Sequence, residues 1–278
     1  LVYLCGMKVE GVALGTLIAQ YAGFLMGIVL WMHNYGRLKR FWEIKNYKLK
    51  IKGGEGAGIW EKGAMFRFFQ VNRDIFLRTL CLVAVTLFFT SAGASQGEII
   101  LAVNTLLMQL FTLFSYVMDG FAYAGEALSG RYIGARNREA FTDTVRHLFG
   151  WGAVIAVLFT LVYALGGNAF LGLLTDDKEV IAVADTYFYW ALAVPAVGIA
   201  AFIWDGIFIG ATATRGMLLS MAAAAVSFFI LYYGLHPVLA NHALWLAFLT
   251  YLLMRGVVQT GLSREVIRRA FPSKKEPA

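Results

Sequence analysis

Five polar side chains in the segment 99–128 recur at intervals that place them on one face of a helix. With about 3.6 residues per turn they fall within about 80° of arc; the five are Asn104, Thr112, Ser115, Asp119 and Glu126. A polar line that faces lipid is costly, so this face must contact protein or water. The functional hypothesis is one wall of a hydrated pathway. The alternative is hydrogen bonding between helices, with Glu126 at the cytoplasmic interface.

Asp205 is a second candidate, because it is a carboxylate inside an apolar segment. It shares a helix face with the small or compact residues Ala191, Val194, Gly198 and Ala201, so a neighbouring helix can come close to the acid. Pro195 in the same segment lacks an N–H and allows a kink. A carboxylate in this setting can carry a proton or a sodium ion. A fixed salt bridge is the equal alternative.

Two arginines also lie inside apolar segments. Arg255 is deep in the last segment and is expected to need a buried acidic partner, for which Glu126 and Asp205 are both candidates. Arg78 follows Asp74 by four residues, the spacing of an ion pair on one helix. We therefore expect Arg78 to pair locally and to extend its charge toward the membrane surface.

The other reactive residues do not form the pattern of an enzyme. Cys5 and Cys81 have no disulfide or metal spacing, and the four histidines do not recur at HxxxH spacing. Glycines at 53–58 lie in a polar stretch rather than between a strand and a helix, so no phosphate loop is indicated. The sequence therefore predicts no catalytic residues, no metal site and no cofactor.

Composition indicates which elements must position these residues. Hydrophobic residues make up 59% of the 278 residues and charged residues 15%, with mean hydropathy +0.66; soluble domains carry about a quarter charged residues. A bilayer core of roughly 30 Å needs about 20 helical residues. Runs of that kind predict an all-α, polytopic membrane protein with seven spans, at 11–33, 74–92, 99–128, 147–171, 180–209, 213–234 and 242–263.

The distribution of Lys and Arg predicts the orientation of the spans. Twenty of these residues lie in the connections 34–73 and 129–146, in the turn near 215 and in the tail, whereas the opposite loops hold Lys8 and Lys178. Positive loops stay cytoplasmic, so the C-terminus is predicted to be cytoplasmic. The basic stretch 47–52 lies between two spans and suits a solvated linker or a segment at the membrane surface rather than a nucleic-acid site.

Four sequence runs resemble the multidrug and toxic-compound extrusion (MATE) transporters, and most of all their DinF-like branch. The runs are Asn72–Leu80, Leu101–Asn104, Asp119–Leu128 and Asp205–Thr212, and Gly134-Ala135 closes the third span. The resemblance extends over essentially the whole chain. It implies twelve helices in two six-helix lobes, with both termini cytoplasmic, in a bacterial inner membrane.

On that map residues 1–33 are the last helix of the N-terminal lobe, 34–72 a basic cytoplasmic linker, 73–264 the six-helix C-terminal lobe, and 265–278 a tail. The first five helices would be absent, including the one that carries the family's best-known coupling aspartate. The resemblance implies antiport of small organic, drug-like compounds against protons or sodium ions by alternating access, and a chain that needs its missing lobe to transport. A lipid-linked oligosaccharide flippase of the same superfamily and a non-transport structural membrane protein remain alternatives.

Overall fold

Every regular element that the structure describes is an α-helix. The computed structural model describes residues 9–35 and 62–272, which fall into two compact units, 1–65 and 66–278. In the first unit lies α2 (Val9–Tyr35). The helices that follow are α4 (Lys62–Ala94), α5 (Glu98–Gly134), α6 (Arg138–Leu174), α7 (Lys178–Gly210), α8 (Thr214–Leu239) and α9 (Asn241–Ala270). The predicted all-α fold class is confirmed.

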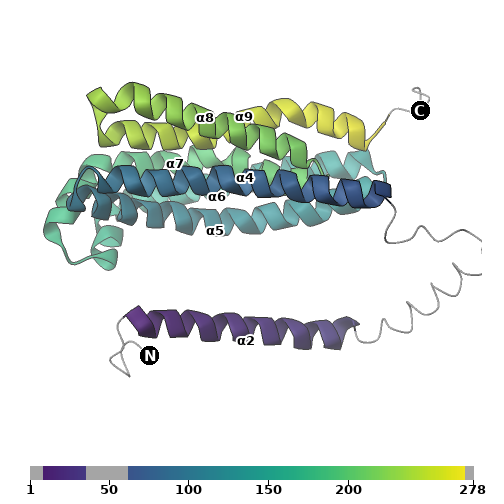
Figure 1. Cartoon of the computed structure of the whole chain (residues 1–278), viewed down its shortest axis with the longest axis horizontal. Coiled ribbons are helices and arrows are strands. Elements are labelled where there is room, and N and C mark those ends of the chain that lie inside the picture. The colour runs from purple at the N-terminus through teal and green to yellow at the C-terminus, as the bar shows by residue number, and fades with distance from the viewer. Residues whose placement is uncertain (1–8, 36–61, 273–278) are drawn as a thin grey trace, which may run out of the picture. The chain divides into compact units, whose positions relative to one another are not determined.

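Six helices are long and apolar enough to cross a membrane, and they coincide with the last six predicted spans. Figure 1 shows these helices, α4 to α9, lying side by side as one bundle. The remaining predicted span, 11–33, falls on α2, where the apolar stretch identified is the shorter Leu17–Leu30. The chain is thus a multi-pass helical membrane protein, and its first span stays a prediction.

Most helices extend beyond the apolar runs that located them. For example, α6 has 37 residues, a length of about 55 Å, whereas the apolar core of a bilayer is roughly 30 Å thick. The part of α6 that exceeds this thickness includes its first turns, which are polar. In the same way α4 begins at Lys62, inside the predicted linker 34–72, and α9 continues into the predicted tail. Most of that linker, residues 36–61, lies outside the described residues.

The centre of the bundle is α7, which packs closely against α5, α6 and α9, while α8 packs mainly against α9. In the apolar windows of α7 and α9, 61% of residues are buried, compared with 17% in α4. Phe88 and Phe89 of α4 nevertheless join the aromatic core through Phe229, with ring centroids 5.0 Å apart, and Trp245, at 5.2 Å. Helix α4 is therefore attached to the bundle chiefly by long side chains.

Two glycines let α7 and α5 approach each other backbone to backbone. A Cβ atom added at Gly206 would collide with the main chain of Ala122, and one added at Gly210 would collide with the main chain of Glu126. These residues belong to the runs 119–128 and 205–212 described above. Residues 84 positions apart in the sequence thus pack directly on each other and fix the position of Asp205.

Candidate functional site

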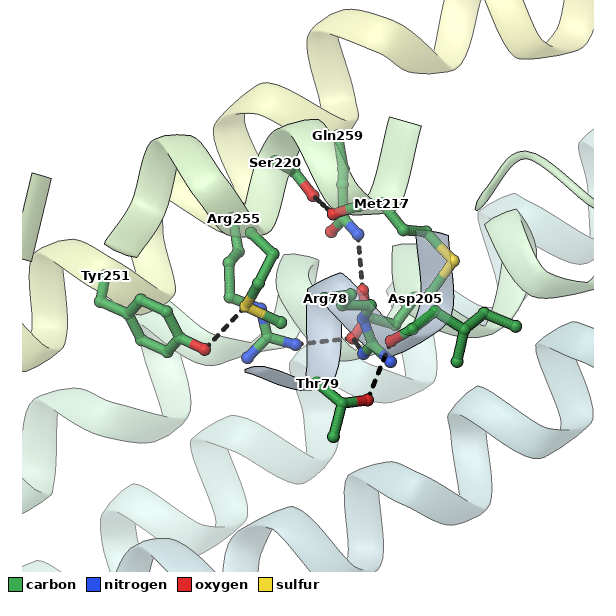
Figure 2. A network of polar contacts seen from close by, with 10 residues as sticks. Arg78, Thr79, Asp205, Met217, Ser220, Tyr251, Arg255 and Gln259 are labelled. Carbon is green, nitrogen blue, oxygen red and sulfur yellow. Dashed lines mark hydrogen bonds and ion pairs between the residues drawn. The ribbon is translucent and has the colours of Figure 1, made fainter. Parts of the chain in front are cut away.

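Asp205 is the centre of a buried polar cluster formed by three helices (Figure 2). Its Oδ2 atom accepts hydrogen bonds from Nη2 of Arg78 on α4 and from Nη2 of Arg255 on α9, the latter at 2.6 Å. Its Oδ1 atom accepts one from Nε2 of Gln259, also at 2.6 Å. We call Arg78, Asp205, Arg255 and Gln259 the Asp205 cluster. It joins α4, α7 and α9 by ionic contacts within their membrane-spanning segments.

The structure decides between the two candidate partners of Arg255, which pairs with Asp205 rather than with Glu126. The expected local pairing of Arg78 is wrong, because Arg78 turns inward and binds Asp205. Asp74 is buried and instead pairs with Arg73 at 3.1 Å, and it accepts a hydrogen bond from Thr214 Oγ1 at 3.3 Å. Helical spacing brings Asp74 and Arg78 near each other, but the inner face of α4 presents them to different helices.

Arg255 is held on several sides. Its side chain is 7% exposed, and its guanidinium lies 5.9 Å from the ring centre of Phe202 and 5.5 Å from that of Tyr251. These are distances at which a cation is attracted to a ring face. The Tyr251 hydroxyl in turn donates to Met221 Sδ at 2.8 Å. Arg255 is thus part of the core of the bundle as well as an ionic partner.

Hydrogen bonding in the Asp205 cluster is incomplete. Within the described part of the chain, three of its buried atoms have no hydrogen-bond partner: Nε of Arg78, Nε of Arg255 and Oε1 of Gln259. Two guanidinium groups also share one carboxylate. The charges of Asp205 and Arg255 act on the half-buried carboxylate of Asp119 on α5. Asp119 thus places a second carboxyl group within electrostatic range of the cluster.

The other four residues of the predicted polar stripe lie in different surroundings. Thr112 and Ser115 donate to carbonyls of their own helix, each at 2.8 Å, and Thr112 also borders a pocket of about 300 Å³ between α5 and α6. Glu126 is half-buried, with its main chain against Gly210. Asn104 is buried and forms hydrogen bonds to another helix. For this residue the alternative of hydrogen bonding between helices therefore holds. The pathway role of the stripe stays a prediction.

Asn104 belongs to a second buried polar cluster at the start of α9. Asn104 and Asn241 exchange two hydrogen bonds, at 2.8 and 3.0 Å, and Trp245 Nε1 donates to Asn104 Oδ1 at 2.9 Å. All three residues are at most 2% exposed. We call them the Asn104 cluster. Asn241 and Arg255 are about 21 Å apart along α9 at the usual helical rise.

Sequence reasoning missed Gln259, Asn241 and Trp245. For Gln259 a signal existed, because it follows Arg255 by four residues and so shares its helix face. Asn241 and Trp245 carry no comparable signal, since their partner is more than 135 positions away and depends on how α5 and α9 are rotated. Among residues 9–35 and 62–272 no group of three His, Cys, Asp or Glu side chains is arranged to hold a metal ion.

Residues 75–238 match the model of the MatE family. The chain is 39% identical over 251 residues to DNA damage-inducible protein F of Escherichia coli. This alignment covers 90% of this chain and 52% of that protein. It is 23% identical to Protein DETOXIFICATION 45, chloroplastic, of Arabidopsis thaliana, over 75% of this chain and 34% of the relative. It is 20% identical to Protein DETOXIFICATION 42 of the same plant, over 92% and 46%. The chain thus spans about half the length of these relatives or less.

Proposed function

This chain belongs to the MatE family, and from that membership we propose that it forms one half of a transporter that exports small organic compounds in exchange for a cation. The DETOXIFICATION names of two relatives support drug-like or toxic compounds as the substrates. The coupling cation is a proton or a sodium ion. Transport, rather than an enzymatic reaction, is the activity that a member of this family is expected to support.

The observation that carries the proposal is the Asp205 cluster. Ionisable residues inside membrane-spanning helices are expensive, and where they occur they mark ion and substrate pathways. In this chain one carboxylate is bound by residues of two further helices, and a second carboxylate, Asp119, lies near it. A cation that neutralises Asp205 would weaken its bonds to both arginines. Such a change can bias one arrangement of the helices over another.

We propose the same division of the chain as the sequence resemblance implies. Residues 1–33 end the N-terminal lobe, 34–72 link the lobes and 73–264 form the C-terminal lobe, followed by a cytoplasmic tail at 265–278. Thr112, Ser115, Asp119, Glu126 and Asp205 then belong to the C-terminal half of the substrate and cation pathway, whereas Asn104 fits the alternative of hydrogen bonding between helices. The partners are the lipid bilayer of a bacterial inner membrane, the substrate and the N-terminal lobe.

The contacts of the two arginines argue against the flippase alternative. A flippase for a lipid-linked oligosaccharide would need free cationic side chains for the phosphate groups of its substrate. Arg78 and Arg255 are both ion-paired with Asp205. An exporter of organic compounds needs no such excess of positive charge.

The proposal is tested by transport measurements on the full-length protein, meaning this chain joined to its N-terminal lobe, in proteoliposomes. The probe is a fluorescent lipophilic organic cation, and a pH gradient or a sodium gradient is imposed separately. We expect one gradient to drive movement of the probe against its own gradient, and liposomes without protein to show none. If the rate of probe movement is the same with and without each gradient, cation coupling is ruled out.

A further inference from the structure

We propose that the two arginines bound to Asp205 have different tasks in the transport cycle. Arg255 is the permanent partner of Asp205, whereas Arg78 is an exchangeable partner that fastens α4 to α7 in one conformation and releases it in another. This inference rests on the proposed transport function and adds a positioning residue to it. The two arginines can be compared directly, because both donate through Nη2 to the same Oδ2 atom.

Arg255 cannot leave Asp205 without disturbing the packing of the core. It lies over the rings of Phe202 and Tyr251. The next residue, Gly256, is so close to α7 that an added Cβ would come within 2.8 Å of Ala200 Cβ. One turn further on, Gln259 holds the other oxygen of the same carboxylate. Movement of Arg255 away from Asp205 would therefore have to separate α9 from α7.

Arg78 has no such surroundings. Its side chain is 20% exposed, compared with 7% for Arg255, so Arg78 reaches the surface of the bundle whereas Arg255 does not. The helix that carries it, α4, is the least buried of the six spans, and its backbone is not among those that pack closely against a neighbour. Withdrawal of Arg78 would break one ionic contact and no close packing between helix backbones.

Further attachments of α4 lie on either side of Arg78. One turn before it, Asp74 accepts a single long hydrogen bond from Thr214 of α8. About ten residues after it, roughly 15 Å along the helix, Phe88 and Phe89 pack into the aromatic core. The aromatic contacts can act as a pivot, because they hold one part of α4 without ionic bonds. The bond between Arg78 and Asp205 then holds the other part.

Crowding at Oδ2 gives a physical reason for the exchange. Two guanidinium groups at one oxygen repel each other, and the partner that is held by fewer other contacts loses less free energy on leaving. Any event that reduces the negative charge of Asp205 therefore releases Arg78 before Arg255. The energy of the Arg78 bond then differs between conformations, which is the requirement for it to shift their populations.

The test compares Arg78→Gln with Arg255→Gln in the full-length protein, with Arg268→Gln as the control. Arg268 is a basic residue of α9 with a 75% exposed side chain, and its partner Glu265 is also at the surface. Folding is measured as the melting temperature in detergent. The position of α4 is measured as the distance distribution between two spin labels by pulsed electron–electron double resonance. The labels are placed at the exposed positions Phe76 on α4 and Leu219 on α8. Gradient-driven transport is measured in proteoliposomes.

We expect Arg78→Gln to change the melting temperature by less than about 4 °C, to alter the α4–α8 distance distribution and to lower transport roughly tenfold. Arg78→Lys, which keeps the charge, should restore part of the wild-type distribution. Arg255→Gln should lower the melting temperature by about 6 °C or more. Arg268→Gln should behave as wild type in every measurement.

Equal losses of melting temperature in the two variants would overturn the inference, and so would a wild-type distance distribution in Arg78→Gln. The distance measurement does not depend on transport. A wild-type protein without gradient-driven transport would therefore refute the proposed function, whereas the distances would still decide the role of Arg78.

Discussion

The Asp205 cluster and the Asn104 cluster are both buried, and both tie α9 to other helices of the bundle. In the Asn104 cluster every polar side-chain atom takes part in a hydrogen bond, and no residue is charged. The Asp205 cluster contains three charges, and within the described residues three of its buried polar atoms have no partner. One chain thus contains two solutions to the problem of polar groups in a membrane.

The difference separates a structural role from a functional one. A closed network of neutral amides fixes two helices in one relation, and nothing in it responds to an ion. An ionic network with unpaired atoms is less favourable in a low-dielectric interior. Such a network is retained where its charge is used, and the carboxylate of Asp205 is the group that a cation can neutralise.

The largest effect is expected where the backbone positions Asp205. Gly206→Ala places a Cβ against the main chain of Ala122, which cannot move aside as a flexible side chain would. We expect a loss of about 3 kcal/mol or more in stability, seen as aggregation in size-exclusion chromatography of the detergent-solubilised protein. Gly120→Ala is the control, because a Cβ there meets no atom within 4 Å. Equal elution profiles of the two variants would show that α5 and α7 do not depend on this contact.

Breaking the permanent ion pair should have the next largest effect. Arg255→Gln leaves Asp205 with Arg78 and Gln259, and loss of one partner of a buried pair costs about 3–5 kcal/mol. The double change Arg255→Gln with Asp205→Asn removes both charges and should recover much of that loss. Thermal unfolding of the two proteins gives the comparison. A double variant as unstable as Arg255→Gln alone would contradict the pairing.

The Asn104 cluster should respond more weakly and without any effect on coupling. Asn104→Leu leaves Asn241 and Trp245 without their partner, at a cost of about 1–3 kcal/mol for each unpaired group. Replacement of both asparagines by leucine should cost less than Asn104→Leu alone. The pH or sodium dependence of transport should equal that of wild type. A changed ion dependence would show that this cluster too takes part in coupling.

The smallest effect is expected from an ion pair at the surface. Glu265 accepts from Arg268 at 2.5 Å and from Arg269 at 2.8 Å, but the two arginine side chains are 75% and 77% exposed. Water competes for such contacts, which contribute little to stability. Glu265→Gln should leave both the melting temperature and the transport rate unchanged within error. A measurable loss would mean that distance alone, without burial, explains the importance of the Asp205 contacts.

Much of the fold could be predicted from the sequence, because apolar runs of sufficient length identify spanning helices. The start of α7 also has a recognisable residue type, because Asp177 caps the helix by accepting from the N–H groups of Glu179 and Val180, a role typical of aspartate at that position. The helix ends were missed because hydropathy records the part of a helix that lies in lipid. The polar first turns of α6 have no such signal.

The site could be predicted in part. Asp205 and Arg255 stood out because charges are rare inside spans, and their pairing was one of two alternatives. The partner of Arg78 was missed because an acid one turn away offered a local explanation, whereas the true partner is 127 positions away. The contact between Gly206 and Ala122 was not anticipated either, because helix rotation and approach are set by the packing of the whole bundle.

The measurement that tests the role of Asp205 most directly is the ion dependence of transport by Asp205→Asn in the full-length protein. The substitution keeps the shape of the side chain and removes its charge, so it fixes the cluster in its neutralised form. We predict normal membrane insertion, a lower melting temperature because the buried Arg255 loses its carboxylate partner, a modest reduction of transport and a flattened dependence on pH or sodium. Wild-type ion dependence in a well-folded Asp205→Asn protein would contradict a role of Asp205 in coupling.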